Sequence, residues 1–253
     1  ILCSSFMLCC FLSFACAKRK KQRKRQSPLK LPGGDGGISI GLLWYCGEGQ
    51  WSVNDWSEGS HAGNLVSAKK GLFDGRFEAF CNILLPELLK EMLMQAKNGA
   101  DAVALFDTAA GELCVADYKE FIVPKISSLL KEFKATSPET RIIYYSKHTQ
   151  GNFVKALDLT NIDVIGVDWR CDLVEIQKLL PPNKFIQGNL DPAWLHLPWE
   201  ILEKKATAYY QDLKDRGLDF SRWIAGLGHG VLIQTPEMNV KNLVKLIQSQ
   251  KIK

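Results

Sequence analysis

The chain alternates between short, nearly continuous apolar runs and longer stretches in which apolar residues recur every three or four positions. The six apolar runs are residues 38–45, 101–106, 141–146, 162–168, 184–189 and 223–230. None of them alternates polar with apolar residues, which is typical of strands in a parallel sheet that is buried on both faces. The pattern therefore predicts an α/β fold in which each strand is followed by a helix.

Apolar residues at helical spacing predict that the segments between these strands are helices. The first stripe consists of Phe77, Phe80, Leu84, Leu88 and Met92. Further helices are predicted over residues 117–133, 153–159, 173–180 and 199–216, and after residue 235. Asp117 with Glu120 favours a capping pair at the start of the second helix. Thr235-Pro236-Glu237 supplies the hydroxyl, proline and acid typical of a helix start.

The first 37 residues differ from the rest of the chain. Residues 1–17 are apolar, residues 18–25 carry seven positive charges, and residues 27–37 are rich in Pro and Gly, as a linker is. The apolar segment can be a short membrane anchor, a targeting segment, or sequence foreign to the domain, and the lack of an initiator methionine favours the last. We expect residues 1–37 to lie outside the fold and residues 38–253 to form one domain.

Charge and cysteine content exclude several classes of partner. Removing the seven charges of residues 18–25 from the net charge of +5 leaves −2 for the rest, which gives no support for nucleic-acid binding. The eight cysteines form no CxxC pair and no Cys/His ligand spacing, so we expect no metal site. Scattered cysteines suit a reducing compartment, which favours the cytoplasm over an organelle or a membrane-anchored state.

Polar residues gather where the predicted strands end. The candidates are Asp107 and Thr108 after the second strand, Asp168 after the fourth, Gln187 and Asn189 around the end of the fifth, and His229 after the last. Taken singly, each has a structural explanation, because an aspartate can cap a loop and a histidine can be hydrogen-bonded near a turn. Together they predict one ligand-lined face at the carboxyl ends of the strands.

Four motifs carry a resemblance to a known family. FDTAAGEL (residues 106–113), VIGVDW (164–169), IQGNLDP (186–192) and GLGHG (226–230) resemble, in this order and spacing, the uroporphyrinogen decarboxylase family. The resemblance implies a (β/α)8 TIM barrel that works as a homodimer without metal or organic cofactor. It further implies removal of carbon dioxide from the four acetate arms of uroporphyrinogen III, giving coproporphyrinogen III in haem synthesis.

The resemblance also implies roles for individual residues. Thr108 and His229 match family residues that contact substrate carboxylates, and Trp56 stands near the place of a family tyrosine. The first two barrel strands of the family carry an arginine in an RQAGR-type motif and an aspartate in an FSD-type motif, and residues 1–37 match neither. We therefore expect an incomplete barrel of about six βα units that decarboxylates its substrate very slowly or not at all.

Two alternatives stay open. A zinc-dependent corrinoid or thiol methyltransferase of the same superfamily needs an HxC-type pair after the third strand, where this chain has Lys147-His148-Thr149-Gln150, and a late cysteine, where it has GLGHG. A non-catalytic barrel remnant is the other alternative, and the intact Thr108 and His229 argue against it.

Overall fold

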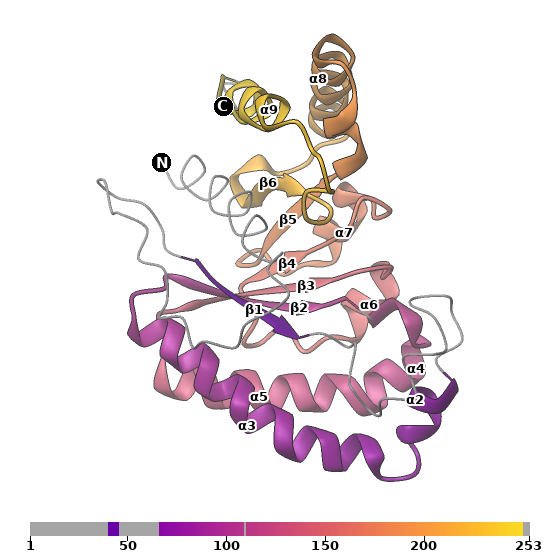
Figure 1. Cartoon of the computed structure of the whole chain (residues 1–253), viewed down its shortest axis with the longest axis vertical. Coiled ribbons are helices and arrows are strands. Elements are labelled where there is room, and N and C mark those ends of the chain that lie inside the picture. The colour runs from indigo at the N-terminus through magenta and orange to yellow at the C-terminus, as the bar shows by residue number, and fades with distance from the viewer. Residues whose placement is uncertain (1–39, 46–65, 109, 250–253) are drawn as a thin grey trace. The chain divides into compact units, whose positions relative to one another are not determined.

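The computed structural model describes residues 40–45, 66–108 and 110–249 of the 253-residue chain (Figure 1). The chain divides into two compact units, the Gly41–Asp163 unit and the Val164–Lys253 unit. The predicted boundary between residues 37 and 38 lies outside the described residues and stays a prediction.

Strands and helices alternate along the Gly41–Asp163 unit. Its elements are β1 (Ile40–Tyr45), α2 (Val66–Gly71), α3 (Arg76–Lys97), β2 (Ala102–Asp107), η3 (Ala110–Glu112), α4 (Val115–Asp117), the π-helical turn η4 (Tyr118–Ile122), α5 (Val123–Thr136), β3 (Arg141–Ser146) and α6 (Gly151–Ala156). Strands β2 and β3 are parallel and paired from Ala102 with Arg141 to Asp107 with Ser146. The carboxyl ends of both strands therefore lie side by side.

Helices α3 and α5 run next to each other against the strands of this unit (Figure 1). The predicted apolar stripe of α3 packs inward at Phe77, Leu88 and Met92, whereas Phe80 and Leu84 are half-buried. The Lys125 ammonium on α5 lies 2.6 Å from the Glu78 carboxylate on α3. The predicted stripe is confirmed as the core side of the helix.

The predicted capping pair is wrong. The helical segment starts at Cys114, whose Sγ accepts a hydrogen bond from the Asp117 backbone N–H at 3.4 Å. Asp117 itself lies inside the first turn, and the π-helical turn η4 follows it. A thiol at the cap position is outside the usual set of Ser, Thr, Asp and Asn, so the sequence pattern places the start three residues too late.

The Val164–Lys253 unit continues the alternation. Its elements are β4 (Val164–Gly166), α7 (Leu173–Leu179), β5 (Phe185–Leu190), η5 (Pro192–His196), α8 (Trp199–Asp215), η6 (Phe220–Arg222), β6 (Trp223–Leu227) and α9 (Glu237–Ser249). The three strands are parallel in the order β4-β5-β6, with Ile165 opposite Ile186 and Asn189 opposite Gly226. All three apolar runs predicted as strands in this part of the chain are confirmed.

The last two helices of this unit pack beside each other. Tyr210 of α8 packs on Trp223 of β6, with ring centroids 5.6 Å apart. The Asn239 amide on α9 donates hydrogen bonds to the carbonyl oxygens of Leu195 and Leu197, at 2.9 and 2.8 Å. Helix α9 begins at Glu237, directly after the predicted start, but the Thr235 hydroxyl donates to the Leu232 carbonyl at 2.7 Å and does not cap the helix, so that part of the prediction is wrong.

Parallel strands that alternate with helices in both units confirm the predicted α/β class. Within the described ranges, no helix is both long and apolar enough to cross a membrane. The apolar segment of residues 1–17 lies outside those ranges.

A partly buried ion pair between Lys134 and Asp163 lies at the amino end of β3. The Asp163 carboxylate accepts hydrogen bonds from the Lys134 ammonium and the Ile142 backbone N–H, both at 2.8 Å, and pairs with Arg141 at 3.3 Å. Burial raises the pKa of Asp163, but these donors and positive charges outweigh it and hold the pKa below its usual value. The carboxylate therefore stabilises the fold in its ionised form.

The pH dependence of this contribution is a testable prediction. We expect Asp163→Asn to lower the free energy of unfolding by about 2 kcal/mol at pH 7. A depressed pKa gives stability above the unfolded value of about 3.9, and that stability is lost as the pH falls through the lower folded value. The difference between wild type and variant should therefore shrink below about pH 4 in urea melts. Glu132→Gln, on the exposed face of α5, is the matched control, and an equal loss there, or a pH-independent difference, contradicts the prediction.

Candidate functional site

The carboxyl ends of β4, β5 and β6 form one edge of the Val164–Lys253 unit. The Gly228 backbone N–H donates to the Leu190 carbonyl at 2.7 Å, which ties the exit of β6 to the end of β5. Gly228 also lies directly against the backbone after β4, because a Cβ added there would meet the Trp169 nitrogen at 2.3 Å. The next residue, His229, is thereby set beside Trp169, with the ring centroids 6.3 Å apart and the planes 85° from parallel.

Asp168 is fully buried at this edge and holds the turn that follows β4. Its carboxylate accepts hydrogen bonds from the backbone N–H and the Nη1 of Arg170, both at 2.9 Å. The Arg170 guanidinium lies over the Trp169 ring, 4.2 Å from its centroid. Asp168 therefore holds Arg170 in place at the carboxyl edge of the strands.

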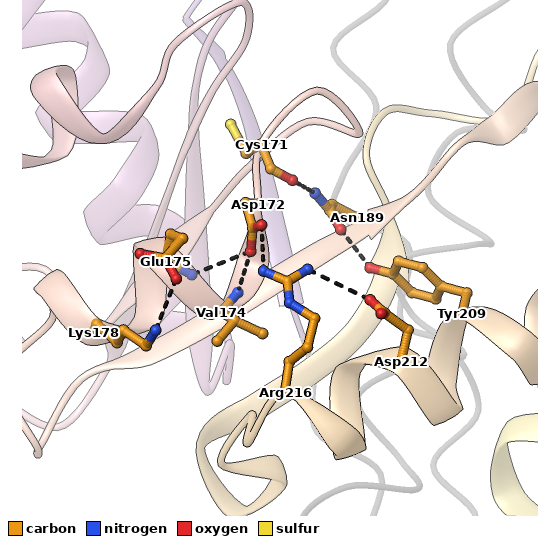
Figure 2. A network of polar contacts seen from close by, with 9 residues as sticks. All are labelled: Cys171, Asp172, Val174, Glu175, Lys178, Asn189, Tyr209, Asp212 and Arg216. Carbon is orange, nitrogen blue, oxygen red and sulfur yellow. Dashed lines mark hydrogen bonds and ion pairs between the residues drawn. The ribbon is translucent and has the colours of Figure 1, made fainter.

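Asn189 crosslinks the same turn to helix α8 (Figure 2). Its Nδ2 donates to the carbonyl oxygens of Asp168 and Cys171, at 2.8 and 2.7 Å. Its Oδ1 accepts a hydrogen bond from the Tyr209 hydroxyl at 2.5 Å. Burial raises the pKa of Tyr209 above its usual value, so the hydroxyl stays protonated and able to donate. These contacts place Asn189 in a supporting role beneath the edge.

An ion pair strengthens the link between α7 and α8 (Figure 2). The Asp172 carboxylate caps α7 by accepting from the backbone N–H groups of Val174 and Glu175 at 3.0 and 3.2 Å. It also pairs with Arg216 at the end of α8, and Arg216 contacts Asp212 at 3.4 Å. Burial raises the pKa of Asp172, but the side-chain hydrogen bond from Arg216 and the two backbone bonds outweigh it and lower the pKa.

Gln187 lies on β5, two residues before Asn189. It is half-buried on β5, opposite Gly166 of β4 and Ile224 of β6. A Cβ added to Gly226 would lie 3.8 Å from its Cγ, so its side chain passes over β6. The Val164–Lys253 unit thus places three of the predicted residues, Asp168, Asn189 and His229, at this edge, and Gln187 precedes the edge on β5.

The Gly41–Asp163 unit has its own polar edge at the ends of β2 and β3. The Asp107 carboxylate is buried and accepts from the Tyr144 hydroxyl at 2.8 Å, and the Tyr144 and Tyr118 hydroxyls are 2.5 Å apart. Burial and the Asp107 charge raise the pKa of Tyr144 well above its usual value. Tyr144 therefore remains a neutral donor that holds the Asp107 carboxylate in place.

Thr108 follows Asp107 and is half-buried. Its side chain makes no hydrogen bond to any residue that the structure describes. Nearby, the Lys147 carbonyl accepts from the Gly111 N–H at 3.1 Å, and the His148 ring lies 3.9 Å from the Glu112 carboxylate. Asp107 and Thr108 therefore share one edge of this unit.

Two of the site expectations stay predictions. Trp56 lies outside the described residues. That the two edges line a common face likewise stays a prediction. Sequence reasoning does not single out Arg170, since an exposed arginine in a turn has the signature of a solvated charge. The signal that could reveal it is the Asp-x-Arg spacing directly after a buried strand.

Cys171 lies at the edge of the Val164–Lys253 unit. Burial and the Asp168 charge raise the pKa of the Cys171 thiol to about 12, so it is neutral at pH 7 and a poor metal ligand. Among the residues placed in the structure, no group of three or more His, Cys, Asp or Glu side chains could hold a metal ion.

Comparisons with known proteins identify the family. The profile of the family "Uroporphyrinogen decarboxylase (URO-D)" matches residues 64–250. "Uroporphyrinogen decarboxylase 2, chloroplastic" of Oryza sativa is 33% identical over 192 residues, covering 75% of this chain and 47% of the rice protein. "Uroporphyrinogen decarboxylase" of Thermosynechococcus vestitus is 34% identical over 170 residues, covering 67% and 48%. The chain spans about half the length of these two relatives.

A solved structure supports the fold independently. A methyltransferase from Methanosarcina mazei superposes with a TM-score of 0.54 at 17% identity, covering 74% of this chain and 55% of that protein. At this identity the similarity concerns the fold alone, and it agrees with the predicted incomplete TIM barrel. The family profile covers most of the chain, including both polar edges, and the chain belongs to the uroporphyrinogen decarboxylase family.

Proposed function

We propose that this chain serves as a uroporphyrinogen decarboxylase, a carboxy-lyase that removes four acetate carboxylates from uroporphyrinogen III to give coproporphyrinogen III. The observation that carries the proposal is the family match over residues 64–250, which includes the strand ends bearing Thr108 and His229. The reaction uses no metal or organic cofactor in this proposal. Residues 38–253 act as one barrel domain.

Thr108 and His229 each bind a carboxylate arm of the substrate. The Thr108 hydroxyl has no competing hydrogen bond among the described residues, which supports this role. The half-buried His229 ring is held beside Trp169 at the end of β6. Charge-assisted hydrogen bonds of this kind contribute about 1.5–3 kcal/mol each.

Loss of carbon dioxide needs more than carboxylate binding. The electrons left behind require a protonated pyrrole ring as a sink, and an anion near the pyrrole N–H groups stabilises that cation. Asp107 and Asp168 are acids at the two edges, but each is buried and already hydrogen-bonded, to Tyr144 and to Arg170. We therefore assign neither of them this role, and we expect residues 1–253 alone to turn over slowly.

The test is an assay of residues 1–253 with uroporphyrinogen under reducing conditions. We expect binding of the substrate, with formation of seven- to four-carboxylate products well below about 1 s⁻¹. His229→Ala and Thr108→Val should each weaken binding about tenfold, because each removes one donor to a carboxylate. Thr207→Val, at an exposed position on α8, is the control for the threonine change.

Three outcomes would count against this account. Failure of the wild-type chain to bind the substrate overturns the proposed function. Turnover at about 1 s⁻¹ or faster shows that an anion within residues 1–253 fills the missing role. Unchanged binding by both variants removes Thr108 and His229 from the site.

The assembly and the compartment also belong to this proposal. We expect a homodimer, which sedimentation of the purified protein measures directly. The rice and maize relatives are named as chloroplastic proteins, whereas the cysteine pattern of this chain favours the cytoplasm. Fractionation of the source cells decides between the two.

A further inference from the structure

The Arg170 side chain is fixed from two directions. Asp168, whose side chain is 0% exposed, binds both its backbone N–H and its Nη1 at 2.9 Å. The Arg170 Cζ lies over the face of the Trp169 ring, 4.2 Å from its centroid. A guanidinium that is paired and stacked in this way loses little further freedom when it binds an anion.

Most of the donor capacity of Arg170 is unused. A guanidinium carries five N–H donors, and the contacts to Asp168 use one of them. Apart from Asp168, the Arg170 side chain has no hydrogen-bond or ion-pair partner among the described residues, and it is 44% exposed. The contact between Nη1 and Asp168 is explained by the need to neutralise a buried carboxylate. The remaining N–H groups of the guanidinium are not needed for this contact.

The position of Arg170 relates it to His229. Trp169 offers its face to Arg170 and contacts the His229 ring in an edge-to-face arrangement, so one indole separates the two groups. Because Asn189 fixes the carbonyl oxygens of Asp168 and Cys171, the turn that carries Trp169 and Arg170 is held to β5. Arg170 and His229 therefore lie at the same edge, and the contacts of Trp169 and Asn189 fix their relative positions before a ligand binds.

We infer that Arg170 is a further substrate-binding residue. It binds a carboxylate of the substrate next to the carboxylate that His229 binds. The inference rests on the proposed function and names a residue that the family resemblance does not supply. A substrate with eight carboxylates needs cationic partners, and a guanidinium edge binds a carboxylate with two parallel hydrogen bonds. The stacked indole keeps that edge oriented and partly shields it from water.

The experiment is a binding titration of residues 1–253 with uroporphyrin, the stable oxidised form of the substrate ring system, followed by porphyrin absorbance. We expect Arg170→Gln to raise the Kd about tenfold, and Arg170→Lys to raise it about threefold, because lysine keeps the charge but loses the planar fork. Lys214→Gln removes the same charge from an exposed position at the end of α8, before the amino end of β6, and should leave the Kd unchanged. Thermal melts establish that each variant is folded.

Each outcome separates this inference from the proposed function. Absence of uroporphyrin binding by the wild type overturns both. Binding by the wild type with an unchanged Kd in Arg170→Gln, or an equal loss in Lys214→Gln, overturns the role of Arg170 and leaves the proposed function standing. If Arg170→Gln does not fold, the lysine variant decides, since a Kd equal to that of the wild type then contradicts the inference.

Discussion

Replacing Gly228 by alanine is expected to destabilise the chain by about 3 kcal/mol or more. A Cβ at this position would lie 2.3 Å from the Trp169 nitrogen, 2.9 Å from the Asp168 carbonyl carbon and 3.0 Å from the Trp169 Cα. All three are backbone atoms, so no side-chain rotation relieves the clash, and the exits of β4 and β6 must separate. Urea denaturation of the variant and the wild type measures the loss.

The matched control lies two residues earlier, within β6. A Cβ at Gly226 would have Gln187 Cγ as its nearest neighbour at 3.8 Å, an ordinary contact distance. We expect Gly226→Ala to change the free energy of unfolding by less than about 1 kcal/mol. Equal stability of the two variants would show that β4 and β6 are not pressed together at Gly228, and the placement of His229 beside Trp169 would lose its support.

The strands could be predicted because they are buried on both faces. Such strands leave continuous apolar runs with no competing period, and the runs at residues 141–146 and 184–189 match β3 (Arg141–Ser146) and β5 (Phe185–Leu190) within one residue at each end. The start of a helix is harder to predict than a buried strand when the N-cap residue is of an unusual type. Thr235-Pro236 correctly marks the position of α9, although the Thr235 hydroxyl bonds Leu232 and is not the cap, whereas the thiol cap of Cys114 has no counterpart in common capping patterns.

The sequence predicts where the candidate site lies better than it predicts the role of each residue in it. Polar residues after buried strands point to the carboxyl edge, and the structure places Asp168, Asn189 and His229 together there. The sequence does not reveal that Asn189 is used internally, because its hydroxyl partner Tyr209 lies twenty residues away on a helix. The same holds for Arg170, whose anchoring becomes visible only once the burial of Asp168 is known.

Removal of the Asn189 side chain should produce the other large effect. Asn189→Ala removes the amide that donates to the carbonyl oxygens of Asp168 and Cys171 and that accepts from the Tyr209 hydroxyl. Each of the three hydrogen bonds contributes about 1 kcal/mol, so we expect a total loss of about 3 kcal/mol in urea denaturation. Asn183→Ala, in the exposed turn between α7 and β5, is the control and should be nearly neutral.

A double-mutant cycle with Tyr209 shows whether the three contacts act as one support. Tyr209→Phe alone removes one donor and should cost about 1 kcal/mol, while in the Asn189→Ala background it should cost almost nothing, because its partner is already gone. Asn189→Ala, where it remains folded at low temperature, should also weaken uroporphyrin binding, since the turn that carries Trp169 and Arg170 is no longer held to β5. Additive losses in the cycle, or full binding by a folded Asn189→Ala chain, would mean that the turn keeps its geometry without Asn189.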